Sequence, residues 1–428
     1  MVDLTSTFRA LSHRNYRLFF GGQSISLIGT WMQLIAVSWL VFRLTDSAFL
    51  LGVVGFSSRI PTFVVAPFAG TVVDRWNRHR LLIATQVLSM LQALLLAVLI
   101  LTGTITVWQI IVLSLLLGLI NAFDIPVRQS FVVEMIEKRE DLGNAIALNS
   151  SMVNGARLVG PSIAGVLIAG VGEGMCFLIN AVSFVPVILS LLAMSVRPGG
   201  KKTQRPSIFE ELKEGFAYAF GFVPIRSVLL LLALVSLMGM PYTILMPIFA
   251  GKILHGGPQT LGFLMGATGV GALGGAIFLA SRKTVLGLGR MIVIASTLFG
   301  AGLIVFSFSR LLWLSFTVMM VIGFGMMVQL TSSNIVLQTI VDEEKRGRVM
   351  SFYTMAFMGM APFGSLLGGG LASRIGAPYT VALGGMACIL GAMTFAKSLP
   401  RLRKLIRPIY VEKGFIRESP LQSLHRNP

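Results

Sequence analysis

The sequence is poor in charged residues. Only 12% of its 428 residues are Asp, Glu, Lys or Arg, whereas a soluble domain carries about 25%. At the same time, 55% of the residues are hydrophobic. A soluble fold could not cover its surface with so few charged side chains, so the composition predicts an integral membrane protein.

Cysteine and histidine are also scarce. The two cysteines, Cys176 and Cys388, lie in apolar runs without CxxC spacing, which excludes a disulfide framework and favours packing roles. The histidines lack the i+3 or i+4 spacing of a helical metal site. Because the chain also has no HExxH motif, P-loop or Ser/His/Asp grouping, we expect no enzyme, no metal and no cofactor.

Long apolar runs dominate the chain instead. A membrane-spanning helix needs about 20 mostly apolar residues. By this criterion we predict an all-α membrane protein with twelve transmembrane helices in two pseudo-symmetric six-helix bundles. The predicted spans are 16–42, 49–73, 81–102, 107–131, 145–170, 175–195, 227–250, 259–281, 288–308, 311–336, 350–374 and 378–397.

The basic residues are distributed unevenly between the two sides of these spans. If both termini are cytoplasmic, the inner flanks carry 29 of the 35 Lys and Arg residues and the outer flanks only four. This positive-inside pattern accounts for most of the net charge of +18 and argues against nucleic acid as a partner. We expect a multi-pass protein of the bacterial inner membrane, with both termini cytoplasmic.

A polar interruption divides the chain into halves. We assign residues 1–196 to an N-terminal six-helix bundle, 197–226 to a cytoplasmic linker, 227–398 to a C-terminal bundle and 399–428 to a basic cytoplasmic tail. Within the linker, Ser207 and Glu210 fit a capping box, and the apolar residues that follow fall on one helical face. An amphipathic helix is therefore expected in the linker.

Two motifs resemble those of a known transporter superfamily. The loop GTVVDRWNRHR (70–80) places Gly70, Asp74, Arg75, Arg78 and Arg80 in the loop motif between spans two and three of the major facilitator superfamily. The fifth span carries that superfamily's antiporter motif. Its matching residues are Gly155, Gly160, Pro161 and Gly165.

The resemblance covers nearly the whole chain and extends to one branch. The stretches SLIGTWMQ (26–33) and LTDSAFLLG (44–52) resemble bacterial drug:proton antiporters, a branch that includes macrolide and enterobactin exporters. Two positions depart from the superfamily pattern. Ser114 stands where many antiporters carry a span-four arginine, and Asn77 stands where the loop often has glycine, a position that suggests a left-handed turn.

The resemblance implies a gate at the loop motif. In the superfamily, the aspartate that matches Asp74 meets the N-terminus of span eleven, which here is expected near residues 347–351. The positive end of a helix dipole attracts such a carboxylate. Arg128 is a plausible second contact, and together these residues would latch the two halves while the transporter faces outward.

Ionisable residues inside the spans are the main candidates for function, because charge is costly there. Asp124 is the only acidic residue well inside a predicted span, and it could exchange the coupling proton or form a permanent ion pair with Arg128 at i+4. Arg157 could bind an anionic substrate group or pair with Asp124. Arg59 has no obvious partner in the sequence.

The resemblance also implies which spans line the central cavity. Polar or adaptable residues at middle depth of those spans are candidates for substrate contact. They are Gln23, Trp31, Gln33, Asn121, Asn154, Met240, Tyr242, Met326, Gln329 and Phe357, in addition to Arg59 and Arg157.

The letters GVGALG (269–274) match a dinucleotide-binding fingerprint, but they lie inside an apolar span, where small residues favour close helix packing. We therefore predict packing at this position and no nucleotide.

The expected protein is a secondary transporter, a monomer whose partners are a small-molecule substrate, protons and the lipid bilayer. Proton-driven export of drugs or a siderophore by alternating access is the favoured function. An importer, a lipid flippase and a non-transporting receptor on the same fold remain alternatives.

Overall fold

The computed structural model describes residues 8–65, 76–194, 208–282 and 284–416, which are almost entirely helical. Gly70, Asp74, Arg75 and Ser207 lie outside these residues. In the described part of the chain, eleven helices are long and apolar enough to cross a membrane. One of them is 51 residues long and is broken by Gly172, whose φ of 81° is non-helical, so it supplies two crossings. The described residues therefore form twelve membrane crossings.

The N-terminal half contains the first six crossings. Its helices are α2 (Arg14–Thr45), α3 (Ala48–Ser57, within a span that reaches Val65), α5 (Arg78–Leu101), α6 (Val107–Glu134) and the long α7 (Leu142–Leu192), with the short 3-10 helices η1 (Arg9–Ser12) and η2 (Arg139–Asp141).

Side-chain caps explain where three of these helices begin. Ser47 accepts a hydrogen bond from the amide of Leu50 at the start of α3, and Thr106 forms a capping box with Gln109 at the start of α6. Asn77 accepts from the amide of Arg80 at the start of α5. Its backbone is extended, with φ −69° and ψ 111°, so the left-handed conformation suggested by the loop motif is wrong at this position.

The C-terminal half contains the other six crossings. Its seventh span is α9 (Val223–Leu234), π-helix η3 (Val235–Gly239), α10 (Tyr242–Ile248) and π-helix η4 (Phe249–Ile253). The next three spans are α11 (Pro258–Ala280), α12 (Leu288–Phe308) and α13 (Leu312–Ile340). The eleventh span consists of α14 (Glu343–Thr354), π-helix η5 (Met355–Gly359) and α15 (Ala361–Ile375), and the twelfth is α16 (Ala377–Glu412).

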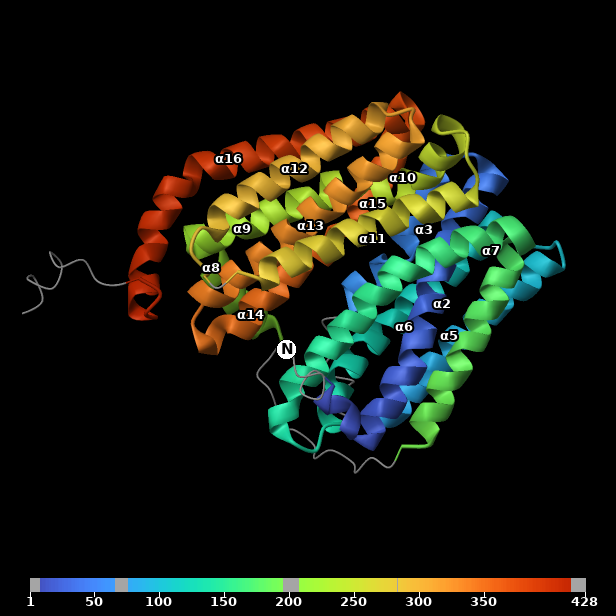
Figure 1. Cartoon of the computed structure of the whole chain (residues 1–428), viewed down its shortest axis with the longest axis horizontal. Helices are drawn as coiled ribbons and strands as arrows, with labels where there is room; N and C mark the ends of the chain where they lie inside the picture. The colour runs from blue at the N-terminus through green and yellow to red at the C-terminus, as the bar shows by residue number, and fades with distance from the viewer. Residues whose placement is uncertain (1–7, 66–75, 195–207, 283, 417–428) are drawn as a thin grey trace, which may run out of the picture.

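Among the described residues, the helices of the two bundles meet toward one end of the molecule. We call the end where α2 begins and the twelfth span ends the terminus face, and the other end the opposite face. Figure 1 shows the bundles side by side where α3, α7, α10 and α11 meet, and apart toward α8 and α14. An ion pair of 2.5 Å between Lys252 Nζ and Asp46 Oδ2 also joins the halves, at the opposite face.

Glycines bring the helices of the two bundles into close contact. A Cβ atom on Gly165 of α7 would lie 2.7 Å from the carbonyl oxygen of Pro258 and 3.0 Å from the Cα of Gly262, both in α11. In the same way, a Cβ on Gly52 of α3 would lie 2.7 Å from the carbonyl oxygen of Ser365 in α15. Only glycine allows these backbones to approach so closely.

The glycine-rich stretch of α11 packs against helices on two sides. Gly262 and Gly269 face α7, whereas Gly271 and Gly275 face α13. The prediction of helix packing at GVGALG is confirmed, since the added Cβ atoms would contact backbone or side chains of these neighbours.

The linker forms the expected helix, α8 (Ile208–Gly221), at the terminus face. It packs against α14 through an ion pair of 2.6 Å between Arg348 Nη1 and Glu214 Oε2. Phe216 stacks on Phe220, and both rings contact Phe352 of α14 edge to face. The linker is thus attached to the eleventh span of the C-terminal bundle.

We expect Gly165→Ala to destabilise the protein by about 1–3 kcal/mol, because the new methyl group would overlap the backbone of α11. The matched control is Gly170→Ala in the same helix, where an added Cβ meets no atom within 4 Å, and its effect should stay within about 0.5 kcal/mol. Denaturant titration in detergent micelles measures both values, and equal effects of the two variants would contradict the assigned packing.

Candidate functional site

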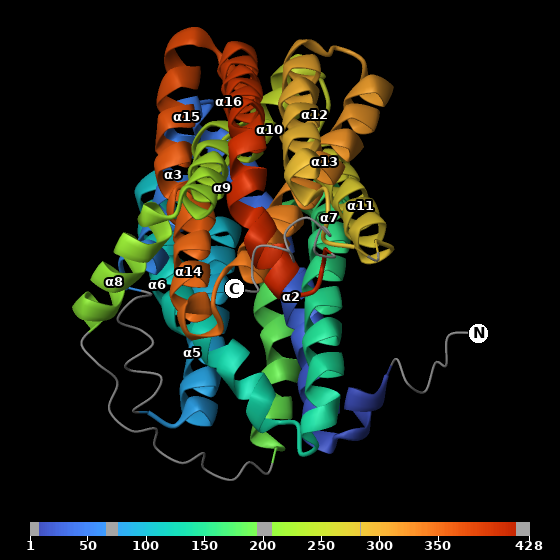
Figure 2. The same cartoon turned by 90° about the vertical axis from the view of Figure 1, so that its left-hand side faces the viewer.

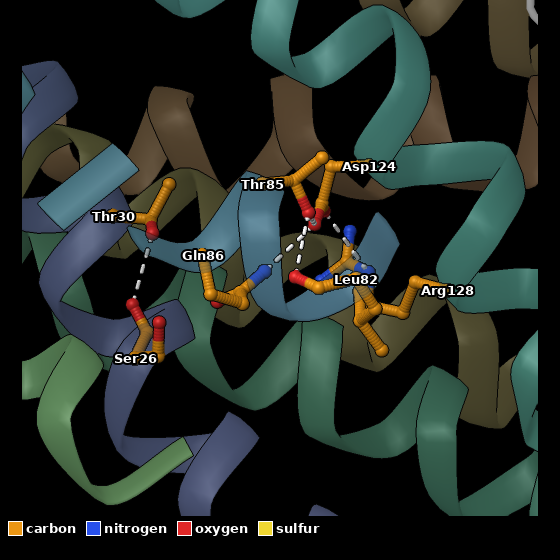
Figure 3. A network of polar contacts seen from close by, with 7 residues as sticks. All are labelled: Ser26, Thr30, Leu82, Thr85, Gln86, Asp124 and Arg128. Atoms are coloured by element: carbon orange, nitrogen blue, oxygen red, sulfur yellow. Dashed lines mark hydrogen bonds and ion pairs between the residues drawn. The ribbon is translucent and has the colours of Figure 1, made fainter. Parts of the chain in front are cut away.

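The carboxylate of Asp124 is buried in the N-terminal bundle, with 6% of the residue exposed. Thr85 Oγ1 and Gln86 Nε2 of α5 approach Asp124 Oδ1 at 2.9 and 2.7 Å, respectively. Arg128 Nε, one turn farther along α6, lies 3.6 Å from Oδ2. Figure 3 shows these three side chains converging on the carboxylate.

The surroundings of Asp124 suit an ionised carboxylate, which can only accept hydrogen bonds. The amide of Gln86 donates a hydrogen bond there, and the guanidinium of Arg128 supplies a positive charge at ion-pair distance. The hydroxyl of Thr85 has a single hydrogen, which can go to Asp124 or to the carbonyl oxygen of Leu82 at 2.9 Å. The predicted i+4 proximity of Asp124 and Arg128 is thus present, and two neutral partners from α5 complete the group.

A small polar cavity adjoins Asp124. Its volume is about 50 Å³, which is enough for a few water molecules, since one needs roughly 10–15 Å³. The polar side chains that line it come from α2, α5, α6 and α7. They are Gln23, Ser26, Thr30, Gln33, Gln86, Ser89, Gln92, Asn121, Asp124, Arg128 and Asn180.

An amide network forms another part of the cavity wall. Gln33 Nε2 donates to Gln92 Oε1 at 2.9 Å, and Asn180 Nδ2 donates to Gln33 Oε1 at 2.6 Å. Gln92 in turn donates to the carbonyl oxygen of Leu113 at 3.2 Å. Gln33 therefore faces the interior of its own bundle, where it shares a polar cavity with Asp124.

Arg157 lies against Trp31 rather than against Asp124. Its guanidinium carbon is 5.7 Å from the centre of the indole ring, within the range of a cation–π contact. Gly160 allows this approach of α7 to α2, since a Cβ there would lie 2.6 Å from Trp31 Cβ. Asn154, one turn before Arg157, donates to the carbonyl oxygen of Ser150 in its own helix.

Arg59 has a partner that the sequence did not indicate. Its Nη1 lies 3.4 Å from Ser365 Oγ on α15 and 3.4 Å from the carbonyl oxygen of Gly55. The contact with Ser365 crosses between the bundles, next to the close approach at Gly52.

The candidates in the C-terminal bundle are placed at or next to its π-helical turns and in α13. Met240 follows η3 directly, and the carbonyl oxygen of Phe357 in η5 accepts from the hydroxyl of Ser236 in η3. Tyr242 and Gln329 are each 1% exposed, and Met326 is fully buried. Among the described residues, the side-chain amide of Gln329 has no hydrogen-bond partner.

The described part of the loop motif is held within the N-terminal bundle. Arg78 Nη1 forms an ion pair of 2.6 Å with Glu134 Oε1 at the end of α6. The backbone amide of Arg80 is part of the cap on Asn77, and the residue itself is exposed.

The antiporter-motif residues lie on different sides of α7. Gly160 faces Trp31, Pro161 and Gly165 face α11, and a Cβ on Gly155 would meet open space.

Sequence reasoning missed the α5 side of the polar site. Thr85, Gln86, Ser89 and Gln92 are all buried, and the last three recur every third residue in an otherwise apolar span. That spacing places them close to one another on the helix, so the sequence did contain a pattern that could have predicted a polar face of α5. No group of three or more His, Cys, Asp or Glu residues that could hold a metal ion is found in the described ranges.

We expect Thr85→Val to reduce the free energy of unfolding by about 1–2 kcal/mol, because a charged carboxylate loses a buried donor. Thr30→Val is the matched control, since the hydroxyl of Thr30 also lies at the cavity but donates only to Ser26 of its own helix. The control should change stability by no more than about 0.5 kcal/mol. Denaturant titration in micelles compares the two, and a control effect as large as that of Thr85→Val would refute the role of this hydroxyl.

Solved structures share the fold at low sequence identity. The nucleoside transporter NupG is 13% identical, with a TM-score of 0.70 over 91% of this chain and 99% of that one. An inward-facing bacterial homologue of the iron transporter ferroportin is 17% identical, with a TM-score of 0.67 over 90% and 98% of the two chains.

Curated relatives align over most of the sequence. The staphyloferrin A transporter of Staphylococcus aureus is 27% identical over 89% of this chain and 95% of its own length. The multidrug efflux pump Tap of Mycolicibacterium fortuitum is 27% identical over 88% and 93%. Macrolide efflux protein A of Streptococcus pyogenes is 23% identical over 92% and 98%.

A family model described as a transmembrane secretion effector matches residues 5–407. Together with the twelve crossings in two bundles, this match identifies a transporter and not an enzyme. The chain belongs to the transmembrane secretion effector family of the major facilitator superfamily.

Proposed function

We propose that this transporter exports hydrophobic or amphipathic small molecules, such as drugs or a siderophore, in exchange for protons and by alternating access. The observation that carries the proposal is the asymmetric contact between the bundles, which are joined near the opposite face and apart toward the terminus face. A pair of bundles that can tilt about such contacts exposes a central site to one side at a time. The efflux activities named for Tap and macrolide efflux protein A support the direction.

We assign the terminus face to the cytoplasm of a bacterial cell. The support is the positive-inside pattern, because 29 of the 35 basic residues flank the spans on this side. With this orientation, we propose that the separation of the bundles toward the terminus face marks an inward-open state, in which a substrate would enter between the bundles from the cytoplasm or the inner leaflet.

The substrate would contact both bundles in the space between them. Arg157 with Trp31 offers a cation beside an aromatic face, which suits an amphipathic molecule with an anionic or aromatic group. Arg59 lies beside the second interbundle contact. Asn154, Met240 and Phe357 supply further polar and adaptable surface in this proposal.

Asp124 would carry the coupling proton. A transported proton needs a carboxylate that changes its surroundings between states, and Asp124 is held by separate side chains from two helices. Movement of α5 relative to α6 would remove Thr85 and Gln86 from the carboxylate. Water in the adjoining polar cavity would supply the path for the proton.

The loop motif would act as the inner latch. α14 begins at Glu343, so the prediction that the N-terminus of span eleven lies near residues 347–351 is wrong by about one turn. In the outward-facing state, Asp74 would instead approach the second and third turns of α14, where Gly347 and Ser351 are exposed in this structure. The ion pair of Arg348 with the linker residue Glu214 lies in the same turns, so the linker helix would move with the latch.

Expression in a host that lacks its own drug exporters tests the function. Cells that express the chain should retain less of some hydrophobic compounds in a panel, and an uncoupler should abolish the difference because the proton gradient drives export. Retention equal to that of empty-vector cells for every compound, at verified membrane expression, would sink the proposal. Uncoupler-resistant efflux would exclude the proton as the driving ion.

Asp124→Asn should reduce efflux driven by a pH gradient to the level of the empty vector, because an amide cannot bind and release the proton. Substrate binding should persist, since the substitution preserves the size of the side chain. Asp141→Asn is the matched control. That residue is also 6% exposed but pairs with His13 away from the polar cavity, so efflux should remain. Full pH-driven efflux by Asp124→Asn would exclude Asp124 as the coupling site.

A further inference from the structure

The last helix continues beyond the membrane. α16 is 36 residues long, whereas about 20 residues span the hydrocarbon core. In Figure 1 the end of α16 bends where it leaves the C-terminal bundle. The second half of the helix contains Pro400 and Pro408, which remove helical hydrogen bonds and favour bending. Its end is attached to α13, because Lys413 Nζ donates to the carbonyl oxygens of Thr339 at 2.8 Å and Val341 at 3.3 Å.

A cavity of about 230 Å³ lies between this extension and the bundle. Its walls come from the first turns of α9 and α12, the end of α13 and the second half of α16. The deep part is apolar and buried, with Val228, Ile292, Val336, Phe395 and Leu402 each at most 5% exposed. An empty cavity of this kind forfeits dispersion contacts, and water gains no hydrogen bonds in it, so hydrocarbon is the suitable occupant.

The mouth of the cavity is basic. Arg403 and Arg407 line it from positions i and i+4 of α16, and both side chains are exposed. Neither arginine takes part in an ion pair with another described residue. Tyr410, one further turn along, also lines the mouth. Guanidinium groups bind phosphate through paired hydrogen bonds, and tyrosine is frequent at the level of lipid headgroups.

We propose that this cavity binds an anionic glycerophospholipid from the leaflet at the terminus face. One acyl chain fills the apolar pocket, and the phosphate accepts hydrogen bonds from Arg403 and Arg407. A free phosphate would leave the apolar part of the cavity empty, whereas a hydrocarbon without charge would leave both arginines without a partner. Only a molecule with an acyl chain and an anionic headgroup matches both parts.

The lipid would be a structural ligand and not a transported substrate. All of the walls belong to the C-terminal bundle, so the site persists when the two bundles tilt relative to each other. By joining α16 to α9, α12 and α13, the bound lipid stabilises the inner end of this bundle.

Thermal unfolding of the purified, delipidated transporter in detergent tests the proposal. Phosphatidylglycerol should raise the unfolding midpoint of the wild type, and phosphatidylcholine with the same acyl chains should raise it much less. In the double variant Arg403→Gln/Arg407→Gln, the apparent affinity for phosphatidylglycerol should fall about ten-fold or more. The matched control, Arg401→Gln/Lys404→Gln, removes two exposed charges from the same helix outside the cavity and should keep the wild-type affinity.

Two further experiments test whether a free phosphate compound can replace the lipid and whether the apolar pocket is needed for binding. Glycerol 3-phosphate, which lacks the acyl chains, should have no effect at concentrations that saturate with the lipid. Val336→Phe, which narrows the pocket and leaves the arginines in place, should also weaken lipid binding, as measured by native mass spectrometry. Equal affinity of both double variants, equal effects of the two lipids, or full stabilisation by glycerol 3-phosphate would each overturn the proposal.

Discussion

The structure depends on the close approach of backbones at two glycine contacts between the bundles, α7 with α11 and α3 with α15. Inside a bilayer, apolar surfaces gain nothing from leaving water, so association of helices rests on packing at short range. Gly165 against α11 and Gly52 against α15 supply that packing. Because backbone packing and few polar side-chain contacts hold these elements together, they can open without breaking a large buried hydrogen-bond network. Two bundles that tilt relative to each other need an interface of this kind, which is closely packed and can still separate.

The buried polar network lies inside the N-terminal bundle, away from the glycine contacts between the bundles. The buried amides and the carboxylate of the N-terminal bundle lie among α2, α5, α6 and α7, and their partners come from the same bundle. Burial of such groups is tolerable because they find hydrogen-bond partners or border a polar cavity large enough for water. The arrangement holds a charge within the membrane, away from the glycine contacts between the bundles.

Much of the fold could be predicted from the sequence. Apolar runs of sufficient length predict the crossings, and the glycine spacing of residues 262–275 correctly indicated packing. The site was harder to predict, because the side-chain hydrogen-bond partners of Asp124, Arg59 and Gln33 lie on other helices and the neighbouring sequence does not indicate them. The conformation of Asn77 was also not predictable from the motif. Its capping role depends on where α5 begins and not on the glycine that often occupies this position of the loop motif.

The π-helical turns of the seventh and eleventh spans have a consequence for the geometry of everything that follows them. A π turn closes its hydrogen bond one residue later than an α turn, so it adds one residue and rotates the next segment by about 100°. After η3, this rotation places Tyr242 against Phe299 of α12, with ring centres 6.2 Å apart. A helical wheel drawn from Val223 at constant pitch therefore assigns the wrong face to each residue beyond Gly239.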